Sequence, residues 1–243
     1  MSYIESFKKL GRATLDLVFP ISCLVCGRDG TYLCESCLTK LPKLEKQICL
    51  VCQKPAPFGK THPTCVSRNT VDGAVAGLSY KDPKVNEIIR MFKYNFVSDL
   101  AKPLSLAIIQ AMNNQGLNDY FQDFTIVPVP LHKRRYNWRG FNQSDLLSTA
   151  LAEKLNIPVK TDLVMRRKFT QPQTKLSASD RKKNLENAFE LTGNGDNPDT
   201  SVGAMKILLL DDVVTSGATA NELAKLLKRG KASEVWIISA AHG

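Results

Sequence analysis

All seven cysteines of this 243-residue chain lie between Cys23 and Cys65. They come in pairs separated by two residues, and a histidine completes the last pair. A Cys-x2-Cys turn directs two thiolates at one tetrahedral ion, and a structural zinc ion takes four such ligands. The spacing therefore predicts two structural zinc sites, whose candidate ligands are Cys23, Cys26, Cys34, Cys37, Cys49, Cys52, His62 and Cys65.

The cysteine-rich segment at 20–68 is predicted to be a module of its own, a double zinc ribbon. It is rich in proline and too short to fold around an apolar core without a staple such as a metal ion. The simplest pairing gives one ion to the first two pairs and the other ion to the last two, and a cross-braced pairing stays open. Two alternatives also stay open: an exposed His62 that leaves only one zinc site complete, and redox sensing by the thiols.

The first 19 residues are predicted to form a separate amphipathic helix. Ile4, Phe7 and Leu10 fall on one side of a helix at 3–18, while the basic residues fall elsewhere. We expect this helix to pack on its own protein, and binding to a membrane surface or a partner is the alternative.

Charge and hydropathy limit where the chain works. No apolar stretch approaches the roughly 20 residues that a spanning helix needs, and the N-terminus lacks the pattern of a secretion signal. We therefore expect a protein that is not transmembrane and is cytoplasmic, with a peripheral position at the cytoplasmic face of the membrane as the alternative. The net charge of +10 favours polyanionic partners, such as phosphorylated metabolites or nucleic acid.

Residues 70–243 alternate between apolar strand patterns and amphipathic helix patterns. Such alternation is typical of βαβ units and predicts an α/β domain with a mainly parallel sheet flanked by helices. Strands are expected at 71–80, 124–130, 187–191, 206–210 and 234–241. Helices are expected at 84–94, 100–112, 142–155 and 218–230, with Asn142 or Ser144 as a cap.

Two adjacent acids follow the apolar run at 206–210. In an open α/β sheet, ligands bind beyond the carboxyl ends of the strands, where Asp211 and Asp212 are expected. The loop that follows opens a helix, whose backbone N–H groups bind phosphate. A sugar phosphate satisfies both features, because its hydroxyls suit the acids and its phosphate suits the loop formed by Val213, Val214, Thr215, Ser216, Gly217, Ala218 and Thr219.

Two other phosphate-binding motifs do not fit this loop. A nucleoside-triphosphate P-loop ends in Gly-Lys-Ser/Thr, and this loop has no lysine. A dinucleotide-binding turn has three glycines at fixed spacing, and this loop has one. A plain strand–turn–helix with an acidic cap stays open, although a cap explains only one of the two acids.

Three motifs occur in an order that resembles the ComF/GntX family. They are VPVPLHKRRYNWRGFNQSDLL at 127–147, FTQPQTKLSASDRKKNLENAF at 169–189 and DDVVTSGAT at 211–219. The run ILLLDDVVTSGAT is similar to the phosphoribosyl-pyrophosphate signature of type I phosphoribosyltransferases. The family joins an N-terminal zinc module to such a domain, here 70–243, and is linked to DNA uptake in natural competence. His62 departs from the family pattern, which usually has cysteine there.

The resemblance implies a site for phosphoribosyl pyrophosphate with Mg²⁺. Asp211 and Asp212 would act as catalytic residues on the ribose, and the loop at 213–219 would hold the 5′-phosphate. The cationic cluster Lys133, Arg134, Arg135 and Arg139 would contact pyrophosphate, for which bidentate arginine is well suited. The polar segment at 166–184 resembles a lid, with Gln171, Gln173, Arg181 and Asn184 as candidate contacts.

The cationic cluster has two other interpretations. It could be a solvated basic loop, as the overall charge suggests. It could also bind nucleic acid, because Tyr136, Trp138 and Phe141 lie among the cations as the aromatic residues of single-strand-binding proteins do.

Three functions follow. The first is a pentosyl-transferring phosphoribosyltransferase involved in DNA uptake, whose acceptor stays unidentified because no residue stands out as its general base. The second is a non-catalytic competence factor that binds single-stranded DNA and has a regulatory or vestigial sugar-phosphate pocket. A regulator of the purine-operon type ranks last, since no helix-turn-helix is added. Inner-membrane DNA-uptake machinery is the expected protein partner.

Overall fold

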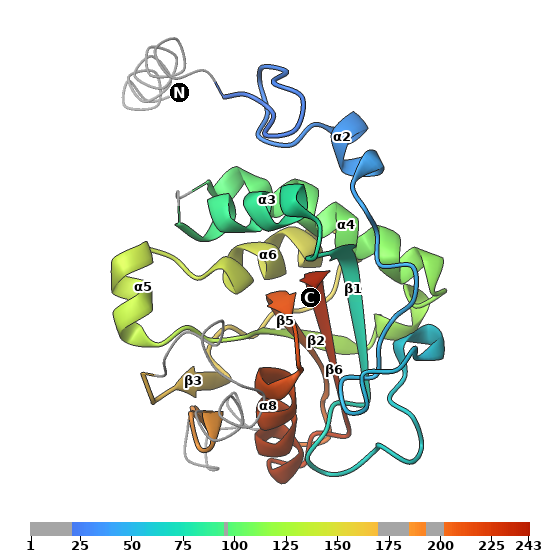
Figure 1. The fold of residues 1–243 in the computed structure, drawn as a ribbon. Coiled ribbons are helices and arrows are strands. Elements are labelled where there is room, and N and C mark those ends of the chain that lie inside the picture. Colours follow the sequence, from blue (N-terminus) through green and yellow to red (C-terminus); the bar gives the residue numbers. More distant parts are fainter. Residues whose placement is uncertain (1–20, 95–96, 170–184, 193–201) are drawn as a thin grey trace. The chain divides into compact units, whose positions relative to one another are not determined.

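The computed structural model describes residues 21–94, 97–169, 185–192 and 202–243 (Figure 1). The chain divides into two compact units, 1–41 and 42–243. The division falls between the two candidate zinc-ligand sets, whereas the sequence placed both sets in one module. The helix expected at 3–18 lies outside the described residues.

The first unit is organised around its cysteines. A tight turn brings the backbone N–H of Gly27 to the carbonyl of Cys23 at 2.8 Å. Helix α2 (Glu35–Lys40) begins directly after Cys34 and carries Cys37 on its buried side.

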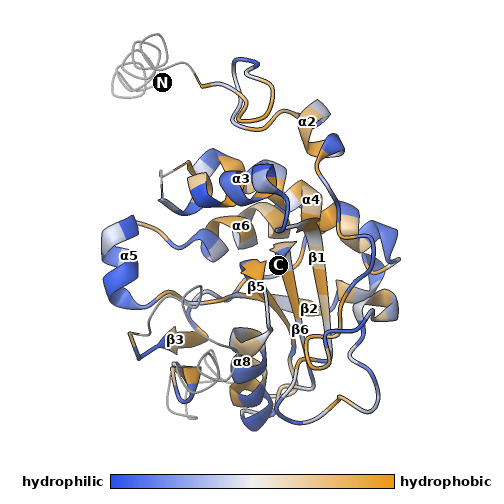
Figure 2. Ribbon diagram, viewed as in Figure 1, coloured by the Kyte–Doolittle hydropathy of each residue, from blue (hydrophilic) through white to orange (hydrophobic). Residues whose placement is uncertain are grey.

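The second unit is built on a sheet of four parallel strands. Their order is β1 (Gly73–Ser79), β6 (Glu234–His242), β5 (Lys206–Val214) and β2 (Phe124–Pro128). Nearly every residue of these strands is buried, as expected for a parallel sheet covered on both faces. Figure 2 shows that β1, β5 and β6 are mostly hydrophobic. The α/β architecture with a mainly parallel sheet is therefore confirmed.

Helices cover the two faces of this sheet. Helices α4 (Ala101–Asn114) and α6 (Gln143–Leu155) pack on one face, and α3 (Pro83–Tyr94) precedes α4. Helix α8 (Ala218–Arg229) covers the other face beside the antiparallel pair β3 (Val164–Arg166) and β4 (Phe189–Leu191). Short 3₁₀ turns occur at η1 (Pro57–Gly59), η2 (Ser98–Leu100) and η3 (Asp119–Phe121).

Two elements differ from the sequence-based expectation. The basic segment, for which a solvated loop was one interpretation, forms helix α5 (Lys133–Arg139), and the His132 side chain caps its first turn by accepting from the Arg134 N–H at 3.2 Å. Strand β5 does not end before the acids but continues to Val214, because β6 pairs with it over the same length. The loop between β5 and α8 is therefore only 215–217.

The free edge of β1 is covered by the segment at 42–60. The Gln47 side chain acts as a strand neighbour: its Nε2 donates to the Ala76 carbonyl at 3.1 Å, and its Oε1 accepts from the Ala76 N–H at 2.8 Å. The backbone continues the pairing, since Leu44 donates to the Gly77 carbonyl at 3.1 Å. Edge backbone groups that would otherwise be unpaired are thereby satisfied.

Across the described residues, no helix combines the length and the apolar character that a membrane crossing requires.

We expect Gln47→Ala to lower the free energy of unfolding by about 2–4 kcal/mol, because two buried backbone groups of Ala76 lose their partners at about 1–3 kcal/mol each. Urea titration of the full chain measures this change. Lys46→Ala is the matched control, since Lys46 is the exposed neighbour. Equal midpoints for the two variants would show that the side-chain pairing contributes nothing.

Candidate functional site

The eight candidate zinc ligands form two sets of four. Within each set, the ligand atoms all lie within 4.8 Å of one another, and the sets follow sequence order: Cys23, Cys26, Cys34 and Cys37, then Cys49, Cys52, His62 and Cys65. His62 belongs to its set, since its Nδ1 lies 3.2 Å from the Cys52 Sγ while its Nε2 donates to the Pro55 carbonyl at 2.9 Å. A metal-bound histidine typically donates its other ring N–H to a carbonyl in this way, and the bond fixes the orientation of the ring.

The thiol pKa values show why each set suits a cation. Burial by itself would raise the pKa of Cys23, but backbone N–H donors lower it to about 6. Burial and the neighbouring thiols raise the pKa of Cys37 to about 12. Cys49 and Cys65 repeat the contrast, since N–H donors lower the pKa of Cys49 to about 7 while burial and its neighbours raise that of Cys65. A divalent ion would let all the thiols of a set ionise together, so the residues fit structural zinc.

The other candidate site lies at the carboxyl edge of the sheet, where β5 presents Asp211 and Asp212. Asp212 is 6% exposed, and its Oδ1 lies 2.8 Å from the Lys93 Nζ. The Asp211 Oδ1 instead accepts from the Asp212 N–H at 2.8 Å and from the Ser144 hydroxyl at 3.4 Å. Two adjacent acids therefore have different environments.

These environments shift the pKa values of Asp211 and Lys93. Burial, followed by the charge of Asp212, raises the pKa of Asp211 to about 7, although Lys93 and Arg166 oppose the rise. Burial alone would lower the pKa of Lys93, but the charge and hydrogen bond of Asp212 outweigh it and raise the value. The Asp211 carboxyl is therefore close to protonation at neutral pH, and a perturbation of this kind is typical of functional sites.

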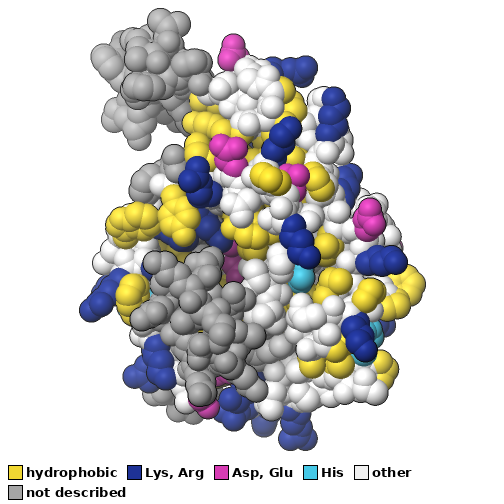
Figure 3. Space-filling model, viewed as in Figure 1, with side chains coloured by type: hydrophobic (Ala, Val, Ile, Leu, Met, Phe, Trp, Pro, Cys, Tyr) yellow, Lys and Arg dark blue, Asp and Glu magenta, His cyan; other side chains and the backbone are white. Residues whose placement is uncertain are grey.

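A cavity of about 390 Å³ opens beside the acids. Besides the acids and hydroxyl groups, its lining contains cations, aromatic rings and amides. These are Lys93, Arg135, Arg139, Arg166, Tyr80, Tyr94, Trp138, Asn142 and Gln143. Figure 3 shows that Lys and Arg side chains are spread over the face of the molecule in view, with fewer acidic side chains among them.

Three guanidinium groups face this cavity. Burial lowers the pKa of Arg135 and of Arg166, in the latter case to about 10, and the charge of a neighbouring arginine adds to each effect. Arg139 is 7% exposed, donates to the Gln143 Oε1 at 2.7 Å and lies over the Tyr94 ring at 4.9 Å. Like charges gathered in a partly buried space favour a polyanionic ligand.

The cationic cluster predicted from the sequence is thus divided by helix α5. Arg135 and Arg139 reach the cavity, whereas Lys133 and Arg134 are exposed and do not line it. Arg134 and Arg135 both lie over the Phe169 ring, at 5.3 and 5.8 Å.

The predicted phosphate loop forms the start of α8. Gly217, at the N-cap position, has φ of 72°, no side chain caps the helix, and no acid lies in its first turn. The backbone N–H groups at this end are therefore available to an anion, and the helix dipole favours one. The Ser216 hydroxyl is buried and has no hydrogen-bond partner among the described residues.

The loop residues differ in their access to ligand. Val213, Thr215 and Thr219 line the main cavity, and Gly217 and Ala218 line a small adjoining space of about 20 Å³. Val214 is buried. The four lid candidates, Gln171, Gln173, Arg181 and Asn184, lie outside the described residues.

Lys93, Arg166, Tyr94 and Gln143 were not identified as site residues from the sequence. They come from three separate elements, with Lys93 and Tyr94 on α3, Gln143 on α6 and Arg166 on β3, and the fold brings these elements to one cavity. One sequence feature could have indicated Lys93: it is the basic residue in the last turn of an amphipathic helix, directly after the buried Phe92.

We expect Asp211→Asn to raise the free energy of unfolding above pH 7. The folded pKa of about 7 exceeds the ordinary 3.8, so the wild-type acid loses stability as the pH rises between these values. The neutral amide avoids that cost, and the difference should vanish below about pH 4. Urea titrations across this range measure it.

Asp212→Asn is the matched control and should act in the opposite direction. Lys93, whose side chain is 22% exposed, then loses its ion pair, at a cost of roughly 1–3 kcal/mol at pH 8. Stabilisation by both variants would contradict the assignment of the lysine to Asp212.

Known proteins resemble both parts of the chain. Residues 14–66 match the Double zinc ribbon domain. The DNA utilization protein YhgH of Escherichia coli K12 is 33% identical over 217 residues, which are 85% of this chain and 89% of that protein. Competence protein F of Haemophilus influenzae is 38% identical over 154 residues, 62% of this chain and 64% of that protein. Competence protein ComFC of Bacillus subtilis is 29% identical over 211 residues, 84% of this chain and 81% of that protein.

Two solved structures resemble the fold more distantly. A phosphoribosylpyrophosphate synthetase from Mycobacterium smegmatis is 14% identical with a TM-score of 0.33, covering 55% of this chain and 33% of that chain. A hypoxanthine phosphoribosyltransferase from Staphylococcus aureus is 13% identical with a TM-score of 0.34, covering 60% of this chain and 63% of that chain. At these scores the likeness says nothing about ligands. The relatives that align along most of their length place the chain in the ComF/GntX family, together with YhgH, competence protein F and ComFC.

Proposed function

We propose that the cavity binds phosphoribosyl pyrophosphate with Mg²⁺ and that the protein is a phosphoribosyltransferase-like factor in DNA uptake. One observation carries the proposal: two adjacent carboxylates, of which Asp212 pairs with Lys93, lie beside an uncapped helix start, and three arginines face the same cavity. The 5′-phosphate suits the N–H groups at the start of α8. The ribose hydroxyls suit Asp211 and Asp212, and the pyrophosphate suits Arg135, Arg139 and Arg166.

Mg²⁺ prefers oxygen ligands and usually binds through one or two carboxylates together with substrate phosphates. Asp211 and Asp212 supply such oxygens at the cavity, so the residues fit the ion. When bound, the ion neutralises charge on the pyrophosphate.

Transfer would break the bond between ribose C1 and the pyrophosphate oxygen, and the acceptor would form a new bond to C1. The bonding electrons leave with pyrophosphate, whose growing negative charge the three guanidinium groups stabilise. Asp211 and Asp212, ionised, stabilise the positive charge that develops on the ribose. Because the pKa of Asp211 is about 7, its contribution is lost as the pH falls below that value.

The printed names of the relatives support the biological setting. Two are competence proteins and one is a DNA utilization protein. We propose that this chain acts in the same process, from the cytoplasm or the cytoplasmic face of the membrane, with inner-membrane DNA-uptake machinery as its partner.

A second candidate function is the binding of single-stranded DNA by helix α5. Trp138 is 63% exposed and Tyr136 is 47% exposed, both among the basic residues of the helix. Exposed rings offer stacking surfaces to bases, and the cations offer contacts to phosphates. The two functions are compatible, because Lys133 and Arg134 face solvent outside the cavity.

We expect phosphoribosyl pyrophosphate with Mg²⁺ to bind, and Arg135→Ala to weaken binding by about 10- to 100-fold, as loss of a charge-assisted hydrogen bond does. Isothermal titration calorimetry measures this. Arg134→Ala is the matched control, because both arginines contact Phe169 but only Arg135 lines the cavity. No heat with the wild-type protein, or equal losses in both variants, would overturn the proposal.

For single-stranded DNA, we expect affinity to fall steeply with salt. Lys133→Ala should reduce the slope of log K against log salt by about 0.7, the value for one phosphate contact on a single strand. Trp138→Ala should weaken binding by roughly 5- to 100-fold without changing that slope, because stacking releases no counterions. Fluorescence anisotropy with a labelled oligonucleotide measures both. Binding that does not respond to salt would exclude this function.

A further inference from the structure

The tetrapeptide Cys-Leu-Val-Cys occurs twice, at 23–26 and at 49–52, once in each candidate zinc set. The two leucines differ in environment. Leu24 is half-buried, whereas Leu50 is 2% exposed and belongs to the core beneath α8. Although the two tetrapeptides are identical, only the second one contributes its leucine to the hydrophobic core of the second unit.

Leu50 packs against the start of α8. A Cβ at Gly217 would lie 2.6 Å from the Leu50 Cβ, so the two residues are already in close contact. Gly217 is the N-cap of the helix whose N–H groups form the proposed phosphate site. Cys49, a candidate zinc ligand, directly precedes Leu50 in the chain, so one peptide unit separates a metal ligand from the support of the anion loop.

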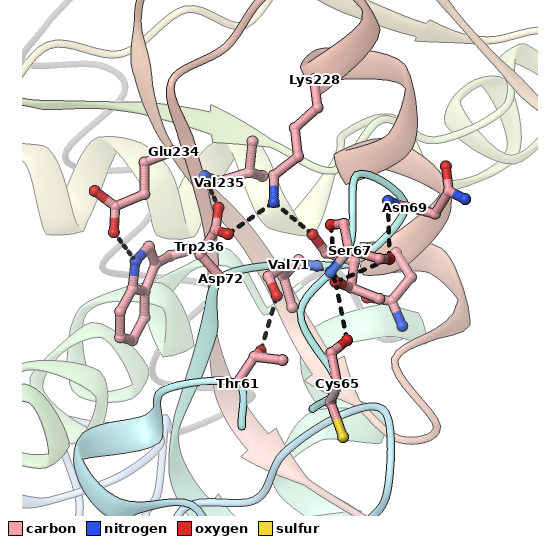
Figure 4. A network of polar contacts seen from close by, with 12 residues as sticks. Thr61, Cys65, Ser67, Asn69, Val71, Asp72, Lys228, Glu234, Val235 and Trp236 are labelled. Carbon is pink, nitrogen blue, oxygen red and sulfur yellow. Dashed lines mark hydrogen bonds and ion pairs between the residues drawn. The ribbon is translucent and has the colours of Figure 1, made fainter. Parts of the chain in front are cut away.

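The segment that follows the last ligand holds α8 in two more places. The Val71 N–H donates to the Asn221 Oδ1, in the first turn of α8, at 3.1 Å. In the last turn, the Lys228 Nζ lies 2.7 Å from the Asp72 Oδ1 and donates to the Thr70 carbonyl at 2.8 Å (Figure 4). These bonds fix the helix along its length against 70–72.

This segment is itself linked to the ligand set. The Thr70 hydroxyl lies 3.5 Å from the Cys65 carbonyl and donates to the Ser67 carbonyl at 3.1 Å. Figure 4 shows Cys65 and Ser67 on the turn that leads to Asp72. The neighbour of Cys49, Leu50, therefore contacts the start of α8, while Cys65 is linked through Thr70 to Lys228 in its last turn.

We propose that the second ligand set, when it holds zinc, positions the anion-binding end of α8, with Leu50 as the positioning residue. Metal ligation orders a segment that has little apolar core of its own. Ordering 49–72 then fixes α8, so zinc occupancy and anion binding at Thr215–Thr219 are energetically coupled. The identity of the anion rests on the proposed function, whereas the positioning of α8 does not.

Coupling is reciprocal, so an anion at α8 must slow the loss of zinc from the second set. Ribose 5-phosphate is a suitable probe because it offers the phosphate and the diol without a chelating pyrophosphate. A chromophoric chelator follows zinc release from full-length Cys26→Ser, which retains the second set, and from Cys65→Ser, which retains the first. We expect the probe to slow release about fivefold or more in Cys26→Ser and to leave Cys65→Ser unchanged.

Hydrogen exchange tests the positioning without any ligand. In Leu50→Ala, amides at 215–221 should exchange about tenfold faster or more, while amides at 236–240 in β6 remain protected. Leu24→Ala, the matched control from the identical tetrapeptide, should change neither group. Leu50→Val is measured in parallel, with a smaller effect of the same kind, so that global unfolding of the alanine variant cannot hide a local change.

The outcomes separate the two proposals. Unchanged exchange at 215–221 in both Leu50 variants would overturn the positioning role, whatever the ligand. Faster exchange at 215–221, together with zinc release that ribose 5-phosphate does not affect, would retain that role and count against the sugar-phosphate assignment. Equal slowing of release from both sets would contradict a coupling specific to the second set.

Discussion

Asp211 and Asp212 lie next to each other in a poorly solvated position, and one lysine, Lys93, offsets only one of the two negative charges. The parallel sheet enforces this arrangement, because β5 pairs with β6 past the acids and holds both side chains at the covered edge. Lys93 satisfies Asp212, and the excess negative charge rests on Asp211. Such an imbalance costs folding free energy. A binding site can retain this excess negative charge when its ligand offsets it, either as a cation or through several hydroxyl groups that donate to the carboxylates.

The opposite imbalance lies across the same cavity. Burial lowers the pKa of Arg135 and of Arg166, and the charge of Arg139 adds to the first shift while the charge of Arg135 adds to the second. A ligand with a neutral, hydroxyl-bearing centre and anionic ends would satisfy both sides at once. This reasoning connects the acids on β5, the basic residues on α5 and β3 and the start of α8 as one binding surface, although they come from distant parts of the sequence.

Much of this arrangement could be predicted from the sequence because its signals are local. Cys-x2-Cys spacing defines the zinc ligands, and an apolar run followed by acids, a glycine and an amphipathic helix defines β5 and α8. Arg166 could not be predicted in this way, and Lys93 stood out only as a lysine at the end of an amphipathic helix, because their roles depend on which elements become neighbours. The helical form of α5 was missed because its basic residues show no apolar periodicity, and its capping by His132 is visible only in the structure.

Both outer strands of the main sheet are already occupied by the chain itself. Gln47 and its neighbours pair with β1, and on the other side Ile126 of β2 exchanges backbone hydrogen bonds with Pro158 and Lys160. Strand addition from another polypeptide would require one of these segments to be displaced. The covered edges thus protect the sheet from edge-to-edge aggregation, and a partner that displaces neither segment must bind through side-chain surfaces on the helices and loops.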